Sequence, residues 1–271
     1  MKTPLWAIQT NLGSTKDVAE IEAAAIRCGA EFRGLKVIPF SDDMPDVETD
    51  RPVIFYGSAR FTSAIARDGR WTPGVFHDDA VLASSLYLKM WGERMVNAGA
   101  MILPLRDVVS APFEDDEEIF IRPDADDKSF AGVVEKFCGL RVWASKICAM
   151  DDAMISAETL VLIGRAVEIQ AEWRCFIIDG SCVAASQYRE DGRMKTTADV
   201  PKDVIAYAEE SWQEWPLMPV VAIDVARLDN GELRIVEAGR LHSTGFYAAD
   251  IHSVVSAVTH ASLRAWNKQN H

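Results

Sequence analysis

The chain has 271 residues, 49% of them hydrophobic and 25% charged, which is typical of a globular protein long enough to bury a sizeable core. Its net charge of −13 argues against a nucleic-acid partner, and any anionic ligand must be met by local cations or a metal ion. No apolar run approaches the roughly 18 residues of a membrane span, and the N-terminus lacks the apolar stretch of a signal peptide. We therefore expect a cytoplasmic protein with no membrane partner.

The N-terminal part of the chain alternates predicted strands and helices. Strands are expected at residues 5–10, 35–39 and 53–56 and around Phe76, and helices at residues 17–28 and 80–97. The first helix carries Val18, Ile21 and Ala25 on one face, as expected for an amphipathic helix that packs on a sheet. This alternation is typical of an α/β layer with a parallel sheet, so we assign residues 1–99 to an N-terminal α/β domain.

Strands dominate the remainder of the chain. They are expected at residues 100–103, 119–123, 158–163, 172–178, 182–188, 220–228 and 232–238, with helices at residues 203–212 and 250–266. A polar loop is expected to follow the strand at 182–188 and to extend to residue 197. The dipeptides Asp179-Gly180 and Asn230-Gly231 predict tight hairpin turns, because glycine and asparagine tolerate the positive φ that such turns require.

The second of these hairpins carries two acids at matching positions. If Asn230 and Gly231 are the two turn residues, Asp229 faces Glu232, and Asp224 then lies directly opposite Glu237. Like charges at directly opposed positions are destabilising. The pair therefore requires a cation or a shared proton, and a hard divalent ion is the more natural solution. A register slip of one residue, or one acid turned to solvent, would separate the two carboxylates.

These acids, followed by a glycine-containing loop at residues 239–245, resemble the magnesium-binding strand pair of the ATP-grasp superfamily. Gly239 replaces the family's asparagine, which leaves the second metal site open. The predicted strand at 119–123 ends in Arg122, where most of the family has a phosphate-binding lysine. This replacement resembles a small bacterial and phage ATP-grasp clade. Arginine keeps the positive charge and can grip two phosphate oxygens at once.

The segment EWRCFIIDG at residues 172–180 resembles the family's E-x-R-x-F-x-x-x-G strand. This implies that Arg174 contacts the transferred phosphate or the substrate carboxylate and that Glu172 contacts the substrate. A buried ion pair between Glu172 and Arg174 is the structural alternative. The same resemblance implies further roles: phosphate contacts from Lys128 and Ser129, adenine contacts from the backbone of Val161 and Ile163, a ribose contact from Glu168, and substrate contacts from Arg240, His242 and Ser243.

The resemblance implies an α+β protein with an ATP-grasp fold. Its ATP-grasp region would cover residues 100–271, with a lid at about 114–165 and a C-terminal antiparallel sheet flanked by helices at about 166–271. The implied cofactors are ATP and Mg²⁺, and the implied reaction joins a small-molecule or peptide carboxylate to an amine or thiol through an acyl phosphate. A phosphotransferase on the same fold and a nucleotide-binding protein without turnover are the two alternatives. Gly239 and Arg122, as departures from the family pattern, keep the last of these open.

Overall fold

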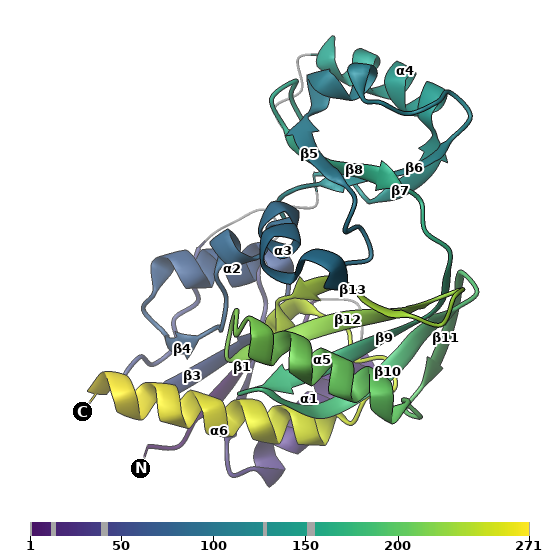
Figure 1. The fold of residues 1–271 in the computed structure, drawn as a ribbon. Coiled ribbons are helices and arrows are strands. Elements are labelled where there is room, and N and C mark those ends of the chain that lie inside the picture. The colour runs from purple at the N-terminus through teal and green to yellow at the C-terminus, as the bar shows by residue number, and fades with distance from the viewer. Residues whose placement is uncertain (1, 12–14, 39–42, 127–128, 151–154, 271) are drawn as a thin grey trace.

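The computed structural model describes residues 2–11, 15–38, 43–126, 129–150 and 155–270. These residues form three separate β-sheets. Figure 1 shows one of these sheets, together with helix α4 (Phe137–Cys148), set apart at the top of the molecule. The other two sheets and most of the helices make up the body below it. None of the helices within these ranges is both long enough and apolar enough to cross a membrane.

The first sheet is parallel, as the sequence predicts, with the strand order β2-β1-β3-β4. Its elements are β1 (Leu5–Gln9), α1 (Thr15–Arg27), β2 (Glu31–Leu35), β3 (Pro52–Tyr56), α2 (Ala59–Asp68) and β4 (Thr72–Gly74). The second strand therefore lies before the predicted range 35–39. Helix α2 was not predicted, although Ser58 caps its first turn and Gly69, with φ of 69°, ends it.

A smaller antiparallel sheet, with the order β5-β8-β6-β7, forms what we call the lid, residues 101–165. Its elements are β5 (Met101–Pro104), η3 (Leu105–Ser110), β6 (Glu118–Pro123), β7 (Val133–Lys136), α4 (Phe137–Cys148) and β8 (Leu160–Arg165). The sequence predicted neither β7 nor α4. The lid has its own apolar core, in which Phe137 and Leu140 of α4 pack against Ile119, Ile121 and Val161.

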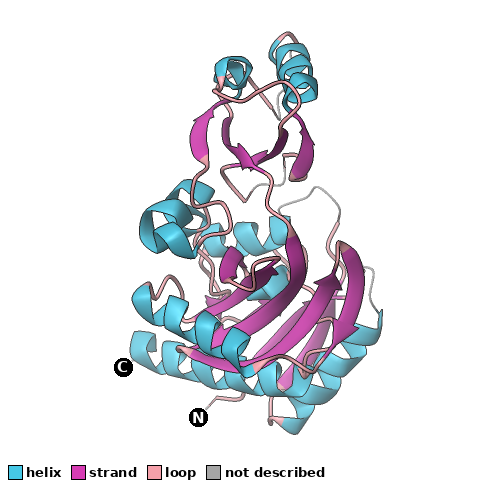
Figure 2. Cartoon of the chain, turned by 45° about the vertical axis from the view of Figure 1, so that its right-hand side comes forward, coloured by secondary structure: helices cyan, strands magenta, loops and turns pink. Residues whose placement is uncertain are grey.

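The third sheet is antiparallel, with the order β11-β10-β9-β12-β13. Its strands are β9 (Ile169–Ile178), β10 (Ser181–Glu190), β11 (Arg193–Thr197), β12 (Val220–Leu228) and β13 (Leu233–Gly239). The prediction of a polar loop extending to residue 197 was wrong, because β11 pairs with β10 at the sheet edge. Figure 2 shows this sheet as the largest in the molecule, with helices on both sides.

Two apolar cores fix the faces of this third sheet. On one face, α5 (Lys202–Glu214) and α3 (Ser84–Trp91) pack against Trp173, Ile177 and Ile223. On the other face, α6 (Ile251–Asn270) and α1 form a single core with Phe176 and with strands β1 and β3 of the parallel sheet. The predicted helix at 80–97 is interrupted, because Gly92 adopts φ of 48° and ends α3. The parallel sheet and the five-stranded sheet are joined through α1 and α6, which pack in one core with both.

Candidate active site

The hairpin of β12 and β13 places Asp224 directly opposite Glu237, as the sequence predicts. The turn itself differs from the prediction. Leu228 N donates to Glu232 O at 2.9 Å, so three residues form the turn, and Gly231 takes φ of 83°. A longer turn shifts the pairing by one residue, and a β-bulge between Asp224 and Val225 shifts it back. The two acids therefore face one another because two irregularities compensate.

A row of charged side chains crosses three strands at this point. Arg174 on β9 is opposite Asp224 on β12, which is in turn opposite Glu237 on β13. The Arg174 guanidinium donates from Nε and Nη2 to the two carboxylate oxygens of Asp224, at 2.8 and 2.7 Å. Asp224 is only 3% exposed. Burial raises the pKa of Asp224, and the bidentate contact with Arg174 opposes that shift.

Two tyrosines that the sequence did not single out hold Arg174 in place. The guanidinium lies 5.6 Å from the ring centre of Tyr188 and 5.3 Å from that of Tyr247. Tyr188 also donates to Glu172 Oε2 at 2.7 Å, and Arg189 donates to Glu172 Oε1 at 3.0 Å. Glu172 thus pairs with Arg189 and not with Arg174. Alternation along β9 puts Glu172 and Arg174 on one face, but only the neighbouring strand shows which partner each one meets.

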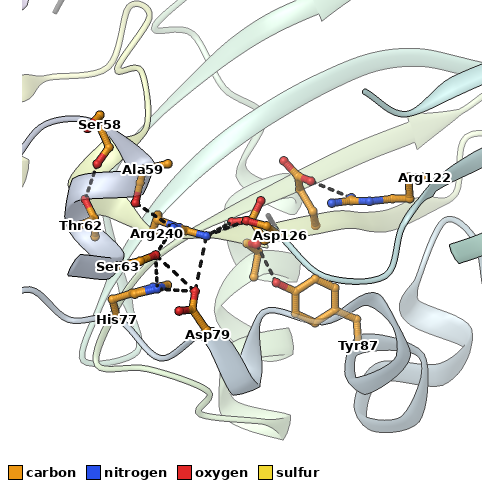
Figure 3. Close-up of polar contacts among 12 residues, drawn as sticks. Ser58, Ala59, Thr62, Ser63, His77, Asp79, Tyr87, Arg122, Asp126 and Arg240 are labelled. Carbon is orange, nitrogen blue, oxygen red and sulfur yellow. Dashed lines mark hydrogen bonds and ion pairs between the residues drawn. The ribbon is translucent and has the colours of Figure 1, made fainter. Parts of the chain in front are cut away.

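The second acid is paired from the lid. Arg122, at the end of β6, donates from Nη1 to Glu237 Oε2 at 2.8 Å. Figure 3 shows the Arg122 side chain with this contact as a dashed line. Each of the two predicted metal-binding acids is therefore paired with one of the two predicted phosphate-binding arginines.

Three adjoining cavities run past these four residues. The first, the apolar cavity, has a volume of about 260 Å³ and is lined by Val96, Asn97, Phe120, Arg122, Gly132, Val134, Val167, Ile169, Glu172, Arg189 and Val236. The central cavity, of about 510 Å³, shares Arg122 and Gly132 with it and adds Arg174, Asp224 and Glu237. The distal cavity, of about 210 Å³, shares those last three residues and adds Arg240, Ser243 and Gly245. Lid and body together thus enclose a cleft with one apolar end and one polar end.

The assignment of adenine contacts to Val161 and Ile163 requires correction. Both residues are buried in the lid core, and both lie on β8, whose backbone pairs with β5 on one side and β6 on the other. Their backbone groups are therefore engaged within the sheet, and they line none of the three cavities. Val167 and Ile169, just beyond β8, line the apolar cavity instead. Glu168 lies exposed between them, so a ribose contact from this residue stays a prediction.

The predicted phosphate-covering loop is only partly described. Lys128 lies outside the described residues. Ser129 is half-buried and directly precedes residues 130–132, which line the central cavity. Gly132 lines both the apolar and the central cavities. A Cβ at this position would come within 3.0 Å of the Phe120 ring, so the absence of a side chain lets the loop pack closely on β6.

The loop after Glu237 contains three of the four residues predicted to contact substrate. His242, in η4 (Leu241–Ser243), is fully buried, with Nδ1 2.6 Å from Phe55 O and Nε2 accepting from Phe76 N at 2.9 Å. Burial lowers the pKa of His242 to about 4. Its ring is neutral and fully engaged with the N-terminal domain, so this position gives it a structural role. Ser243 lines the distal cavity.

Arg240 is the centre of a buried polar cluster, shown in Figure 3. Its Nη1 donates to Ala59 O at 3.1 Å and to Ser63 Oγ at 2.8 Å, both on α2. Its Nη2 donates to Asp126 O and Asp126 Oδ2 at 2.8 and 2.7 Å, just beyond the end of β6. Arg240 therefore connects the N-terminal domain, the loop after Glu237 and the base of the lid. No sequence motif indicated a role for Asp126.

The acids present fit a magnesium ion bound together with a nucleotide. Among the described residues there is no group of three or more histidine, cysteine, aspartate or glutamate side chains that could hold a metal. Mg²⁺ in nucleotide sites is commonly held by one or two carboxylates, with phosphate oxygens and water completing the octahedron. Asp224 and Glu237 provide such a pair, and Gly239 lines the same cavity without contributing a side-chain ligand.

Comparison with known proteins places this fold and site in a recognised class. Residues 102–257, more than half of the chain, match the ATP-grasp domain, R2K clade family 2. The chain therefore belongs to the ATP-grasp superfamily, as the sequence motifs predict. Within that superfamily it is a member of family 2 of the R2K clade. No protein with a curated description matches the chain in sequence.

Solved structures show the same fold at low sequence identity. D-cycloserine synthetase DcsG superposes with a TM-score of 0.67 at 15% identity, covering 97% of this chain and 99% of that one. A RimK domain ATP-grasp protein from Sphaerobacter thermophilus gives 0.65 at 16% identity, covering 93% and 97%. D-alanine–D-alanine ligase from Bacillus anthracis gives 0.58 at 9% identity, covering 99% and 100%. At these identities the likeness establishes the ATP-grasp fold, which confirms the predicted fold class.

Proposed function

We propose that this protein is an ATP- and Mg²⁺-dependent ligase that joins a carboxylate to an amine through an acyl phosphate. The observation that carries the proposal is the row formed by Arg174, Asp224 and Glu237, with Arg122 reaching it from the lid. Membership of the ATP-grasp superfamily supports it, as does the shared fold with a D-cycloserine synthetase and a D-alanine–D-alanine ligase.

The cleft suggests how ATP would lie. The apolar cavity, with Val134, Val167 and Ile169 in its wall, suits the adenine ring. Arg122 lines both this cavity and the central one, so the phosphates would follow it toward Asp224 and Glu237. The transferred phosphate would then lie where the central and distal cavities meet.

The four charged residues would have complementary electrostatic roles. When bound, Mg²⁺ would be held by Asp224 and Glu237 and would neutralise charge on the phosphate oxygens. Arg122 and Arg174, which pair with those carboxylates in the structure, would turn their guanidinium groups to the phosphates. The arginines would thereby exchange the acids for phosphates, and the acids would exchange the arginines for Mg²⁺. No buried charge would be left unpaired, which would be costly.

The chemistry then needs positioning and charge stabilisation but no side-chain nucleophile. The substrate carboxylate attacks the terminal phosphorus, the bond from that phosphorus to ADP breaks with its electron pair leaving on ADP, and Arg174 stabilises the charge that spreads over the transferred group. The stacked rings of Tyr188 and Tyr247, 5.1 Å apart, would remain beside that guanidinium as it turns to the phosphate. The amine next gives up its ammonium proton to water and attacks the acyl carbon as the neutral amine. A C–N bond forms, the C–O bond to phosphate breaks with its electron pair leaving on phosphate, and the departing phosphate takes the remaining proton from the nitrogen.

The test is product analysis with a matched variant. The protein is incubated with Mg-ATP and a pool of carboxylates and amines, and both ADP release and new masses are recorded. We expect ADP together with an amide product, and loss of both in Asp224→Asn. In the control, Asp203→Asn, an exposed acid on α5 loses the same charge and activity should persist. A stable phosphorylated product would identify a phosphotransferase, and tight Mg-ATP binding without ADP release would identify a binding protein without turnover.

A further inference from the structure

The distal cavity is the part of the cleft whose occupant is not ATP. It is continuous with the central cavity through Asp126, Arg174, Asp224 and Glu237, which line both. Its volume of about 210 Å³ suits a small polar group or one end of a longer molecule. The charge of that group can be inferred from the hydrogen-bonding groups in the wall that are still available.

Arg240 lines the distal cavity but neither of the other two, and its guanidinium is already hydrogen-bonded within the protein. Its two terminal nitrogens donate to α2 and to Asp126, and its side chain is 6% exposed. The remaining Nε–H is buried away from solvent and so does not face the cavity. Arg174 is committed to Asp224 and becomes available only toward phosphates, in the exchange described above. The cations in the wall therefore offer little to a substrate anion.

The groups that remain available are acceptors. Asp126 uses Oδ2 and its main-chain oxygen for Arg240, whereas Oδ1 has no hydrogen-bond partner among the residues that the structure describes. Its side chain is 20% exposed, so the carboxylate reaches the cavity. The hydroxyl of Ser243 can accept as well as donate. Such a wall favours a group that carries positive charge and several N–H donors.

We propose that the distal cavity binds the amine substrate as its ammonium form and that Asp126 is the residue that recognises it. This inference rests on the proposed ligase function and names the substrate class that its second site takes. Arg240 acts as a positioning residue, because it fixes the Asp126 carboxylate against α2 while leaving one oxygen directed to substrate. The amine nitrogen would then lie beside the acids that mark the phosphate end of the cleft. Figure 3 shows this pair at the meeting point of three segments far apart in sequence.

The experiment measures binding of two simple probes to the full-length protein saturated with Mg-ADP. Glycinamide carries an ammonium group and no carboxylate, and acetate carries the reverse. Ligand-observed saturation-transfer NMR should show glycinamide binding, and Asp126→Asn should weaken it about tenfold, since a charge-assisted hydrogen bond is lost. Asp126→Glu, which keeps the carboxylate, should retain part of the affinity. Asp116→Asn, the same change in an exposed loop, should have no effect.

Unchanged affinity for Mg-ADP in Asp126→Asn shows that the cleft is still folded. The proposal is overturned if the wild-type protein fails to bind glycinamide, if acetate binds at least as well, or if Asp126→Asn binds glycinamide like the wild type. These outcomes are separate from the test of the ligase. If the protein releases ADP but Asp126→Asn binds glycinamide as well as the wild type does, the amine site alone is refuted. If glycinamide binding depends on Asp126 but the protein never releases ADP, the ligase function is refuted and the cation site is retained.

Discussion

Replacing either member of the Arg174–Asp224 pair should destabilise the fold far more than replacing both. The pair is nearly inaccessible, with side chains 12% and 4% exposed and a closest contact of 2.7 Å. Asp224→Leu leaves a buried guanidinium without its anion, and removing one partner of a buried pair costs about 3–5 kcal/mol. In the double variant Arg174→Met/Asp224→Leu no unpaired charge remains, and much of the loss should be recovered. The coupling energy of the cycle should therefore amount to several kcal/mol.

Arg227 and Asp203 provide a matched control, because they have the same side-chain types and a contact of 2.8 Å but exposures of 25% and 57%. Exposed pairs contribute about 0–1 kcal/mol. Urea unfolding of the seven proteins in the two cycles, which share the wild type, followed by circular dichroism, measures both coupling energies. A coupling at Arg174–Asp224 no larger than that at Arg227–Asp203 would refute the argument that burial makes this pair interdependent.

Three further predictions concern other parts of the molecule. Because burial lowers the pKa of His242 from 6.5 to about 4, the unfolded chain binds more protons between these values, so stability should fall as pH drops through this window, by up to about 3 kcal/mol. His242→Gln should show a shallower fall in urea titrations at pH 4–7, and an identical slope would contradict the assignment. Gly180→Ala should lower the melting temperature more than Gly192→Ala. Both glycines have positive φ, but only at Gly180 would a Cβ meet Trp212, at 2.6 Å; equal shifts would show that backbone strain alone matters. Arg122→Met should weaken Mg-ATP binding measured by calorimetry, with Arg122→Lys intermediate; wild-type affinity in Arg122→Met would remove this residue from the phosphate site.

Much of the site could be predicted from sequence because its central unit is local. Asp224 and Glu237 are joined by a short hairpin, so alternation and a turn signal suffice to bring them together. Even there, the three-residue turn and the bulge were not predicted, and the pairing survived because they offset one another. Arg174 was found through a motif on a single strand for the same reason.

What could not be predicted depends on contacts between distant segments. Arg122 and Glu237 are 115 positions apart, and Arg240 and Asp126 are 114 apart, so no local pattern indicates either pair. Val161 and Ile163 were misassigned because the order of strands in the lid, and hence which backbone is already paired, is set only when the sheet assembles.

The sequence by itself thus determined the parallel layer, the acidic hairpin and the strand at 172–178, since each follows from hydrophobic periodicity and turn chemistry over a few residues. Tertiary structure alone decided which charge meets which. It gave Asp224 and Glu237 an arginine each, turned His242 inward and brought Asp126 to the wall of the distal cavity. Burial is the physical reason, because a charge removed from water must find a partner wherever the packed elements provide one.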